Sequence, residues 1–151
     1  MTDTRTRAQE LLTPTALTVF RLNGQFLAVS EELARPAGLT AAHWQVLGAV
    51  LDTALPVSGI ARVMGITRQS VQRVADILVA DGLAEYRPNP AHKRAKLVAA
   101  TPEGLAAVAR ISPGHAAFAQ RLLDELGTDQ FARTVEVLRR LSHALDALER
   151  D

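Results

Sequence analysis

The side chains best suited to chemistry lie in residues 67–81, which the sequence predicts to be a helix. Val71, Val74, Ala75 and Leu78 recur at helical spacing, so they face the core. The opposite face carries Arg68, Gln69, Gln72, Arg73 and Asp76. In the major groove of DNA, Arg pairs with guanine and Gln with adenine, each through two hydrogen bonds. The residue types therefore indicate base contacts by Gln69, Gln72 and Arg73, and the alternative is a face that is only solvated.

The first turn of this helix favours a phosphate group. Free N–H groups and the helix dipole attract anions to a helix N-terminus. Arg68 and Ser70 are therefore expected to contact the DNA backbone, beside the capping residue Thr67.

A second basic group lies between two short extended segments, residues 84–87 and 95–100. The connection, residues 88–94, contains two prolines that limit its flexibility and ends with His92, Lys93 and Arg94. An arginine that enters a narrow minor groove reads the shape of DNA more than its sequence. The alternative is that these cations only make a surface turn more soluble.

The charge distribution agrees with one localised anion-binding surface. The chain has a net charge of only +1. Residues 62–96 hold seven basic and three acidic residues, a net charge of +4, and the remainder holds 10 basic and 13 acidic residues, a net charge of −3. A basic centre between acidic flanks favours a specific site over general adhesion to anions.

Other function classes lack support in the sequence. The absence of cysteine excludes disulfides, Cys-based zinc sites and thiol chemistry. The four histidines show no i, i+4 pairing with one another, so we expect neither a metal site nor a cofactor. No nucleophile–base pair, phosphate-binding glycine loop or paired carboxylates indicate an enzyme. No apolar run reaches the roughly 18 residues that span a bilayer, and the polar start is not a signal peptide, so we expect a cytoplasmic protein without a membrane partner.

Capping residues and apolar spacing predict a mainly α fold with a small β-wing (α+β). The first ten residues are expected to be frayed, and Thr13-Pro14 to begin a helix with one stripe of Leu17, Phe20, Gly24, Leu27 and Glu31. Thr40 caps a second helix that buries Trp44, Leu47 and Leu51, and residues 57–64 form a third that buries Ile60, Ala61 and Met64. Gly82 ends the helix of residues 67–81, so that Leu83 packs on Leu78.

Two further helices are predicted towards the end of the chain. Thr101-Pro102 begins one that Ser112-Pro113-Gly114 kinks or restarts and that continues to about Leu126. In the last helix, apolar spacing alternates between three and four at Phe131, Thr134, Leu138, Leu141, Leu145 and Leu148. Such a seam packs on a partner helix, which the first helix of the same chain supplies only in part.

The order helix, glycine turn, helix, strand, basic tip, strand is that of a winged helix-turn-helix. The segments IARVMG, TRQSV, the L-x-x-x-G-L at residues 78–83 and RAKLVAATPEG resemble the MarR family of bacterial transcription regulators. The flanking helices also match, so the resemblance covers about residues 13–148. It implies one chain with a winged-helix lobe at 40–100 and dimerisation helices at 13–35 and 102–149, the dimer contacts including Leu17, Leu138, Leu141, Leu145 and Leu148.

The resemblance further implies a homodimeric, sequence-specific regulator, expected to be a repressor, on a pseudo-palindromic operator in double-stranded DNA. Arg94 corresponds to the wing arginine of the family, and Lys93 to a neighbouring basic position. Family wings often read D-P-x-D-R-R, whereas this chain has Asn89 and His92 in place of the two acids. The tip is therefore more basic, and a brace for the wing arginine is missing.

Family members commonly release DNA when a small phenolic or anionic molecule binds between the dimer layer and the DNA-binding lobe. The residues that could line such a pocket are Phe20, Phe26, His43, Trp44 and His115, with Arg21 beside them. The structural alternatives are that Phe20 and Trp44 belong to the core and that His43 lies at a helix start.

Three other readings stay open. A winged helix can serve protein contact without DNA, although the basic tip argues against that use here. An enzyme has no motif in its favour. A coiled-coil adaptor would account for the last helix but leave the middle of the chain unexplained.

Overall fold

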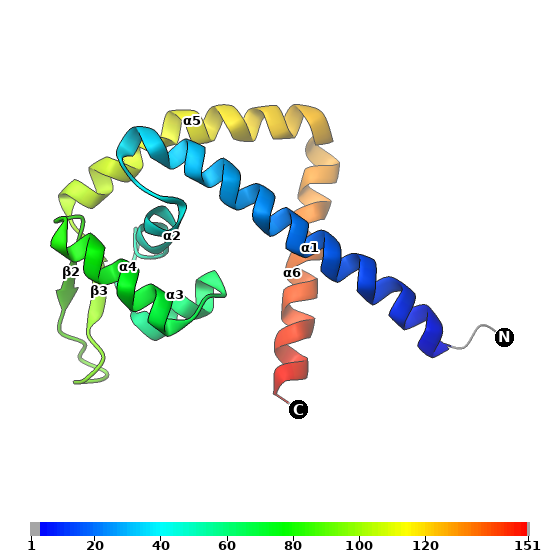
Figure 1. Cartoon of the computed structure of the whole chain (residues 1–151), viewed down its shortest axis with the longest axis horizontal. Coiled ribbons are helices and arrows are strands. Elements are labelled where there is room, and N and C mark those ends of the chain that lie inside the picture. Colours follow the sequence, from blue (N-terminus) through cyan, green and yellow to red (C-terminus); the bar gives the residue numbers. More distant parts are fainter. Residues whose placement is uncertain (1–3, 151) are drawn as a thin grey trace. The chain divides into compact units, whose positions relative to one another are not determined.

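The computed structural model describes residues 4–150. Figure 1 shows the elements, which are α1 (Thr4–Ala34), the 3-10 turn η1 (Arg35–Ala37), α2 (Ala41–Ala49), β1 (Leu55–Pro56), α3 (Val57–Met64), α4 (Arg68–Ala80), β2 (Ala84–Arg87), β3 (Leu97–Ala100), α5 (Pro102–Leu126) and α6 (Thr128–Glu149). They fall into two units, one ending at Ile111 and the other beginning at Ser112. The chain is therefore mainly helical with a small sheet, which confirms the predicted fold class.

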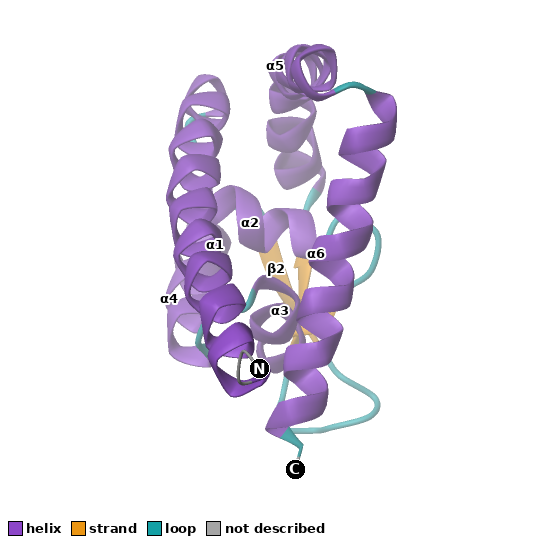
Figure 2. Cartoon of the chain, turned by 90° about the vertical axis from the view of Figure 1, so that its right-hand side faces the viewer, coloured by secondary structure: helices purple, strands orange, loops and turns teal. Residues whose placement is uncertain are grey.

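The core of the first unit lies where α2, α3 and α4 meet the sheet. Its large, fully buried side chains are Leu47, Ile60, Leu78, Ile111, Val46, Val71 and Val98. α2 contacts α1, α3 and α4, and Figure 2 shows the strands beside α2 and α3. Val71, Val74, Ala75 and Leu78 of α4 are all buried, as their helical spacing predicts. The core thus fixes the rotation of α4 about its axis and decides which side chains face outward.

The sheet has three antiparallel strands in the order β1-β3-β2. Tyr86 pairs with Val98 across β2 and β3, whereas β1 joins the other edge of β3 through Leu55 and Pro56. The strand β1 is not predictable from the sequence, because two residues that include a proline carry no strand periodicity. An edge strand tolerates proline, whose missing N–H is not needed there. Residues 88–96 connect β2 to β3 as the wing, which projects below α4 in Figure 1.

Three threonines cap helices as predicted. Thr40 Oγ1 accepts from the N–H of His43, Thr67 Oγ1 from that of Ser70, and Thr101 Oγ1 from that of Gly104. Thr101 Oγ1 also donates to the carbonyl of Gly82, tying the start of α5 to the end of α4. These bonds satisfy N–H groups that a helix leaves free at its N-terminus.

The end of α4 also follows the prediction. Gly82 has a left-handed φ of 77°, the N–H of Gly82 donates to Val79, and that of Leu83 donates to Leu78. This pair of bonds is the Schellman motif, in which glycine is favoured because it lacks a Cβ. The chain therefore turns sharply from α4 into β2.

The predicted start of the first helix was wrong. α1 begins at Thr4, not Thr13, so Pro14 lies inside it and the stretch expected to be frayed is helical from Thr4 onward. Residues 7–12 consist of good helix formers, and Arg7 pairs with Glu10 at 3.4 Å, which supports the extra turns. α5 ends at Leu126 as predicted and runs from Pro102 through Pro113 without a restart, while the kink expected there stays a prediction. The carbonyls that each proline leaves unpaired lie on exposed helix, where water can bind them.

Some residues expected to be buried are only partly so, among them Trp44 of α2. α2 ends at Ala49, so Leu51 lies beyond it and is only partly buried. Met64 is partly buried as well, whereas Ile60 and Ala61 are buried as predicted. Phe20, for which a core position was the alternative to the ligand pocket, is 70% exposed. Glu31, on the same stripe of α1, accepts a hydrogen bond at 2.8 Å from the N–H of Ala41 and so caps α2.

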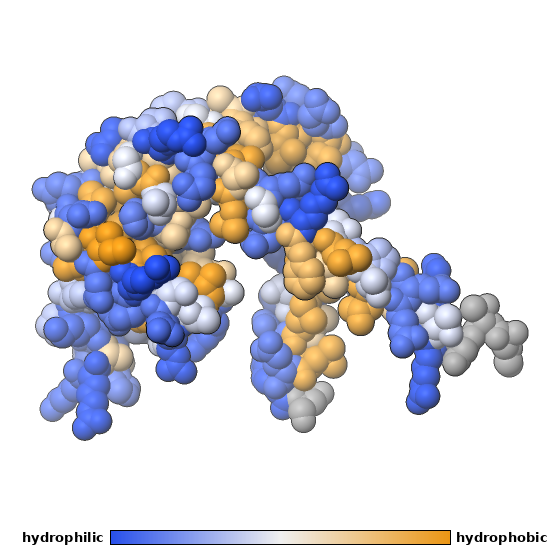
Figure 3. All heavy atoms as spheres, in the orientation of Figure 1, coloured by the Kyte–Doolittle hydropathy of each residue, from blue (hydrophilic) through white to orange (hydrophobic). Residues whose placement is uncertain are grey.

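The second unit holds the rest of α5 and α6. Gly127, with φ of 78°, separates the two helices and accepts the N–H of Phe131. No residue of α6 is buried, and Leu145 and Leu148 are 53% and 71% exposed. Figure 3 shows apolar residues of α6 open to solvent. The apolar seam predicted for this helix is therefore present but uncovered within one chain.

Candidate nucleic-acid interface

The outward face of α4 carries the side chains that the sequence analysis placed there. Arg68, Gln69, Gln72, Arg73 and Asp76 are all exposed. Within residues 4–150, none of the three cations Arg62, Arg68 and Arg73 pairs with a carboxylate. Arg62 lies on α3. It was not among the predicted site residues, although its charge contributes to the net charge of +4 in residues 62–96. The face thus offers unpaired guanidinium groups to an anion.

The capping residues are bound within the helix. Thr67 Oγ1 donates to Ser70 Oγ at 2.9 Å and accepts from the N–H of Ser70 at 3.1 Å. Ser70 is half-buried, and both hydroxyls therefore serve the first turn of α4. Their predicted contact with DNA phosphate stays a prediction.

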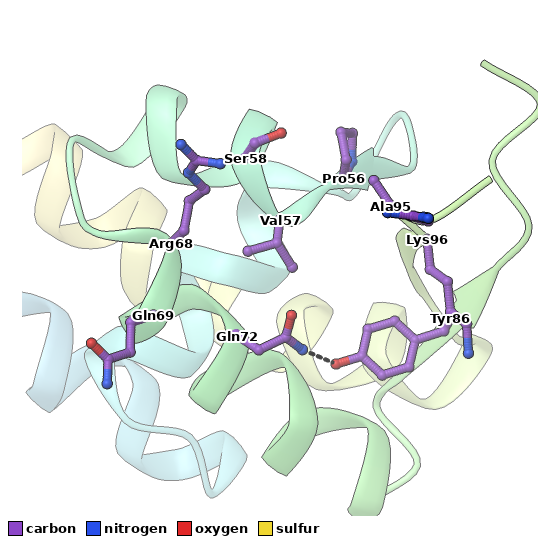
Figure 4. A pocket seen from close by; sticks show the side chains of 10 residues that line it. Pro56, Val57, Ser58, Arg68, Gln69, Gln72, Tyr86, Ala95 and Lys96 are labelled. Carbon is purple, nitrogen blue, oxygen red and sulfur yellow. Dashed lines mark hydrogen bonds between the residues drawn. The ribbon is translucent and has the colours of Figure 1, made fainter. Parts of the chain in front are cut away.

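Gln72 is joined to the wing strand by a hydrogen-bonded bridge that the sequence analysis did not foresee. Its Nε2 donates to Asp76 Oδ1 at 3.0 Å and to Tyr86 Oη at 2.9 Å, the second bond being drawn in Figure 4. Tyr86 Oη donates in turn to Asp76 Oδ1. Spacing along α4 could have suggested the contact between residues 72 and 76. Tyr86 lies on another element, so only the tertiary structure brings it in.

Burial of the Tyr86 ring and the neighbouring carboxylate raise the pKa of this phenol from 10.0 to about 12. Burial is the larger cause, followed by the hydrogen bond and the negative charge of Asp76, which both disfavour a phenolate. Lys96 Nζ lies 6.0 Å from the centre of the same ring, at the limit of a cation–π contact. Tyr86 therefore stays protonated and links β2 to α4.

A cavity of about 590 Å³ lies between the start of α4 and the base of the wing (Figure 4). Its lining comes from β1, α3, α4, β2 and the wing, and includes the cations Arg68, Arg94 and Lys96 together with Gln72 and Tyr86. A second cavity of about 500 Å³ is lined by Arg62, Thr67 and Arg68, among others. The tertiary structure thus brings cations from α3, α4 and the wing to one side of the lobe.

The wing tip is built from two successive turns. Asn89 Oδ1 accepts from the N–H of Ala91, and its carbonyl accepts from that of His92, whose own carbonyl accepts from Ala95. An Asn that bonds two residues ahead stabilises a turn as Asp does. His92, Lys93 and Arg94 are exposed, and no carboxylate of residues 4–150 pairs with Arg94. Arg87 differs, since it pairs with Glu85 at 2.7 Å.

The residues proposed for a ligand pocket have mixed surroundings. Trp44 packs against the core, and His43 Nδ1 accepts the N–H of Thr40, which agrees with the structural alternatives for both. Phe20 and Phe26 are exposed on α1, whereas His115 belongs to the second unit. The pocket therefore stays a prediction, as do the dimer contacts of Leu17 and of the seam on α6.

Residues 4–150 contain no group of three or more His, Asp or Glu residues that could hold a metal ion. None of the helices in the same part of the chain combines the length and apolar character needed to cross a bilayer.

Comparison with known proteins identifies this arrangement. The uncharacterized protein Rv2011c of Mycobacterium tuberculosis is 40% identical over 129 residues, covering 85% of this chain and 90% of its own. BpsR of Bordetella bronchiseptica, whose DNA binding is regulated by 6-hydroxynicotinic acid, is 26% identical, with a TM-score of 0.74 and coverage of 85% of this chain and 98% of its own. A mutant MarR of E. coli, solved in complex with operator DNA, is 24% identical, with a TM-score of 0.72 and coverage of 86% and 94%.

The model of the MarR family matches residues 37–95, which contain α2, α3, α4, β2 and the wing tip. The match therefore falls on the elements that build the basic face. Sequence, fold and solved relatives agree, and the chain belongs to the MarR family of winged-helix transcription regulators.

Proposed function

We propose that this protein is a sequence-specific DNA-binding regulator that represses transcription as a homodimer. The observation that carries the proposal is the basic face of the lobe, defined here as Arg62, Arg68, Arg73, Lys93, Arg94 and Lys96. These six cations come from α3, α4 and the wing, are exposed, and pair with no carboxylate of residues 4–150. Unpaired cations on a rigid surface gain affinity for DNA by releasing its counterions.

Within this face, α4 enters the major groove and the wing follows the minor groove. The polar side chains Gln69, Gln72 and Arg73 then meet base edges, which carry the sequence information. Arg94 at the wing tip contacts the narrow minor groove, where negative potential is strongest. Thr67, Arg68, Ser70, His92 and Lys93 contact the DNA backbone and fix the register.

The homodimer explains why apolar residues of α1 and α6 are uncovered. Leu17 is 62% exposed, and Leu138, Leu145 and Leu148 are also exposed. Monomeric proteins rarely leave long apolar stripes in water, so a second copy is the natural cover for both helices. Two-fold symmetry then predicts a pseudo-palindromic operator with half-sites about one helical turn, roughly 10 bp, apart. A dimer on such a site blocks polymerase by occlusion.

A small aromatic acid is the effector class that the relative BpsR supports, since 6-hydroxynicotinic acid regulates its DNA binding. The proposed contacts are Phe20, Phe26, His43, Trp44 and His115. An effector that binds the free dimer more tightly than the DNA-bound dimer releases the operator by linkage.

Selection from random duplexes, followed by fluorescence anisotropy across a salt series, tests the proposal. We expect a two-fold symmetric preferred sequence, bound on the order of 10³-fold more tightly than a scrambled duplex and with steep salt dependence. Weak binding that is equal on both duplexes would instead favour a winged helix that contacts another protein. Adding aromatic acids to the bound complex then tests release, and transcription from the preferred sequence tests repression.

A further inference from the structure

Two glutamines on the same open face of α4 have different surroundings. The Gln69 amide forms no side-chain hydrogen bond within residues 4–150. The Gln72 amide is held from two sides, by Asp76 one turn along α4 and by Tyr86 of β2, at 3.0 and 2.9 Å. Gln72 is thus ordered before DNA arrives, whereas Gln69 is free to rotate.

The chemistry of Asp76 decides which way the Gln72 amide faces. A carboxylate only accepts hydrogen bonds, so the nitrogen of the amide must lie towards it, and the oxygen must lie away. Tyr86 Oη donates its own hydrogen to Asp76, so it too receives a hydrogen from Gln72. Gln72 Oε1 therefore points away from the bridge and keeps its lone pairs for an outside donor.

The position of Asp76 is otherwise unfavourable. It is an exposed acid on α4, the helix that also carries Arg68 and Arg73, where a negative charge repels phosphate. The contacts of Asp76 are with Gln72 and Tyr86, and Tyr86 is half-buried with Lys96 beside its ring. An orienting role for Asp76 accounts for an acid at this place.

We propose that Asp76 and Tyr86 are positioning residues that hold Gln72 with Oε1 towards the base edges, so that Gln72 selects adenine or cytosine at one position of each half-site. The inference rests on the proposed function. In the major groove, adenine and cytosine present an amino group, whereas guanine and thymine present a carbonyl oxygen. An amide oxygen held towards the groove accepts from the first pair and is opposed by the second.

Base analogues test the contact of Gln72. In the preferred duplex, each adenine or cytosine is replaced in turn by the purine or pyrimidinone that lacks its exocyclic amino group. We expect the wild-type protein to lose about tenfold in affinity at one position of each half-site through Gln72. Gln72→Ala should lose nothing further from that replacement, because the partner is gone. Gln69→Ala is the matched control and should keep the wild-type loss at that position.

Variants of the bridge test the positioning. With Asp76→Ala or Tyr86→Phe, the loss caused by the analogue at that position should shrink to about twofold, because a rotating amide offers oxygen and nitrogen alike. Asp76→Ala should also bind a scrambled duplex more tightly, since a negative charge has left the face. Asp76→Asn removes the same charge but keeps an acceptor oxygen, so it should restore sensitivity to the analogue. Thermal unfolding near the wild-type temperature shows that each variant is folded.

The outcomes separate this inference from the proposed function. Specific binding in which no position depends on Gln72, or in which Asp76→Ala keeps full sensitivity to the analogue, would overturn the positioning role alone. Failure of Asp76→Asn to restore that sensitivity, with Asp76→Ala insensitive, would show that charge rather than orientation matters. A wild-type protein without any sequence preference would overturn both.

Discussion

The winged-helix lobe, residues 40–100, and α6 use apolar side chains in opposite ways. The lobe buries Val46, Leu47, Ile60 and Leu78 completely, whereas α6 buries no residue and exposes Leu145 and Leu148. Both segments have strong helical periodicity, so local sequence does not explain the difference. The lobe combines several elements that cover one another, whereas α6 lies in a unit that contains only one other helical segment. Under the proposed function the lobe, whose apolar core is buried within its own unit, contacts DNA, and the exposed seam of α6 serves assembly.

The largest effect is expected from breaking the seam on α6. Leu141→Glu with Leu145→Glu should give monomers, because two carboxylates cannot be buried against a second apolar helix. Affinity for a two-half-site operator should then fall on the order of 10²–10³-fold, through loss of the linked second binding event. Light scattering and anisotropy measure the two changes. His143→Glu with Ala147→Glu has the same spacing on the opposite side of α6 and should stay dimeric, and a dimeric seam variant would refute the seam.

A steric clash between α5 and the lobe should have the next largest effect. A Cβ added at the buried Gly104 would lie closer than 3.0 Å to the carbonyl oxygen of Leu83, which cannot move freely because Thr101 donates its N–H to it. Gly104→Ala should therefore reduce the free energy of unfolding by about 1–3 kcal/mol, despite the better helix propensity of alanine. Chemical denaturation measures the change.

The control for this substitution is Gly48→Ala in α2, where nothing lies within 4 Å of an added Cβ. It should leave stability unchanged or raise it by up to about 1 kcal/mol. Equal stabilities for the two variants would show that α5 does not pack on the lobe as described.

The wing should affect DNA binding without affecting assembly. Arg94→Ala should weaken binding to most duplexes and reduce the salt slope by about 1, because one cation that displaces DNA counterions is lost. The protein should remain a dimer, since Arg94 is far in sequence from the seam and belongs to the lobe. Arg73→Ala is the comparison, expected to cost about 1–3 kcal/mol mainly on the preferred sequence. Wild-type binding by Arg94→Ala would contradict the placement of the wing in the minor groove.

The smallest expected effect is on the pH dependence of stability, and it tests the bridge between Tyr86 and Asp76 in the lobe. Tyr86 is the only tyrosine, so near-ultraviolet absorbance reports its ionisation alone. Its raised pKa, about 12 against 10.0, means that the unfolded chain ionises first as pH rises. Stability should therefore be independent of Tyr86 below pH 10 and fall between pH 10 and about 12. Asp76→Asn should lower the midpoint of the titration, and an unchanged midpoint would count against the bridge.

Local chemistry was readable wherever the deciding atoms are close in sequence. Thr67 begins α4 because its hydroxyl accepts the N–H of the residue three positions later. Gly82 ends it because glycine, without a Cβ, adopts the left-handed conformation. Both effects act within one helical turn. The outward face of α4 followed from the spacing of its buried residues. At Pro14 the same reasoning gave the wrong start, since a proline favours the first turn but does not forbid an exposed helix from continuing through it.

The sequence by itself therefore determined the order of the helices and the two wing strands, the open face of α4 and the basic wing, through spacing, caps and charge. Only the tertiary structure decided which distant residues meet. It added Leu55 and Pro56 to the sheet, brought Tyr86 to Gln72, and set Gly104 against Leu83. Such contacts join residues that local periodicity does not relate, because packing of whole elements, and not the neighbouring sequence, brings them together.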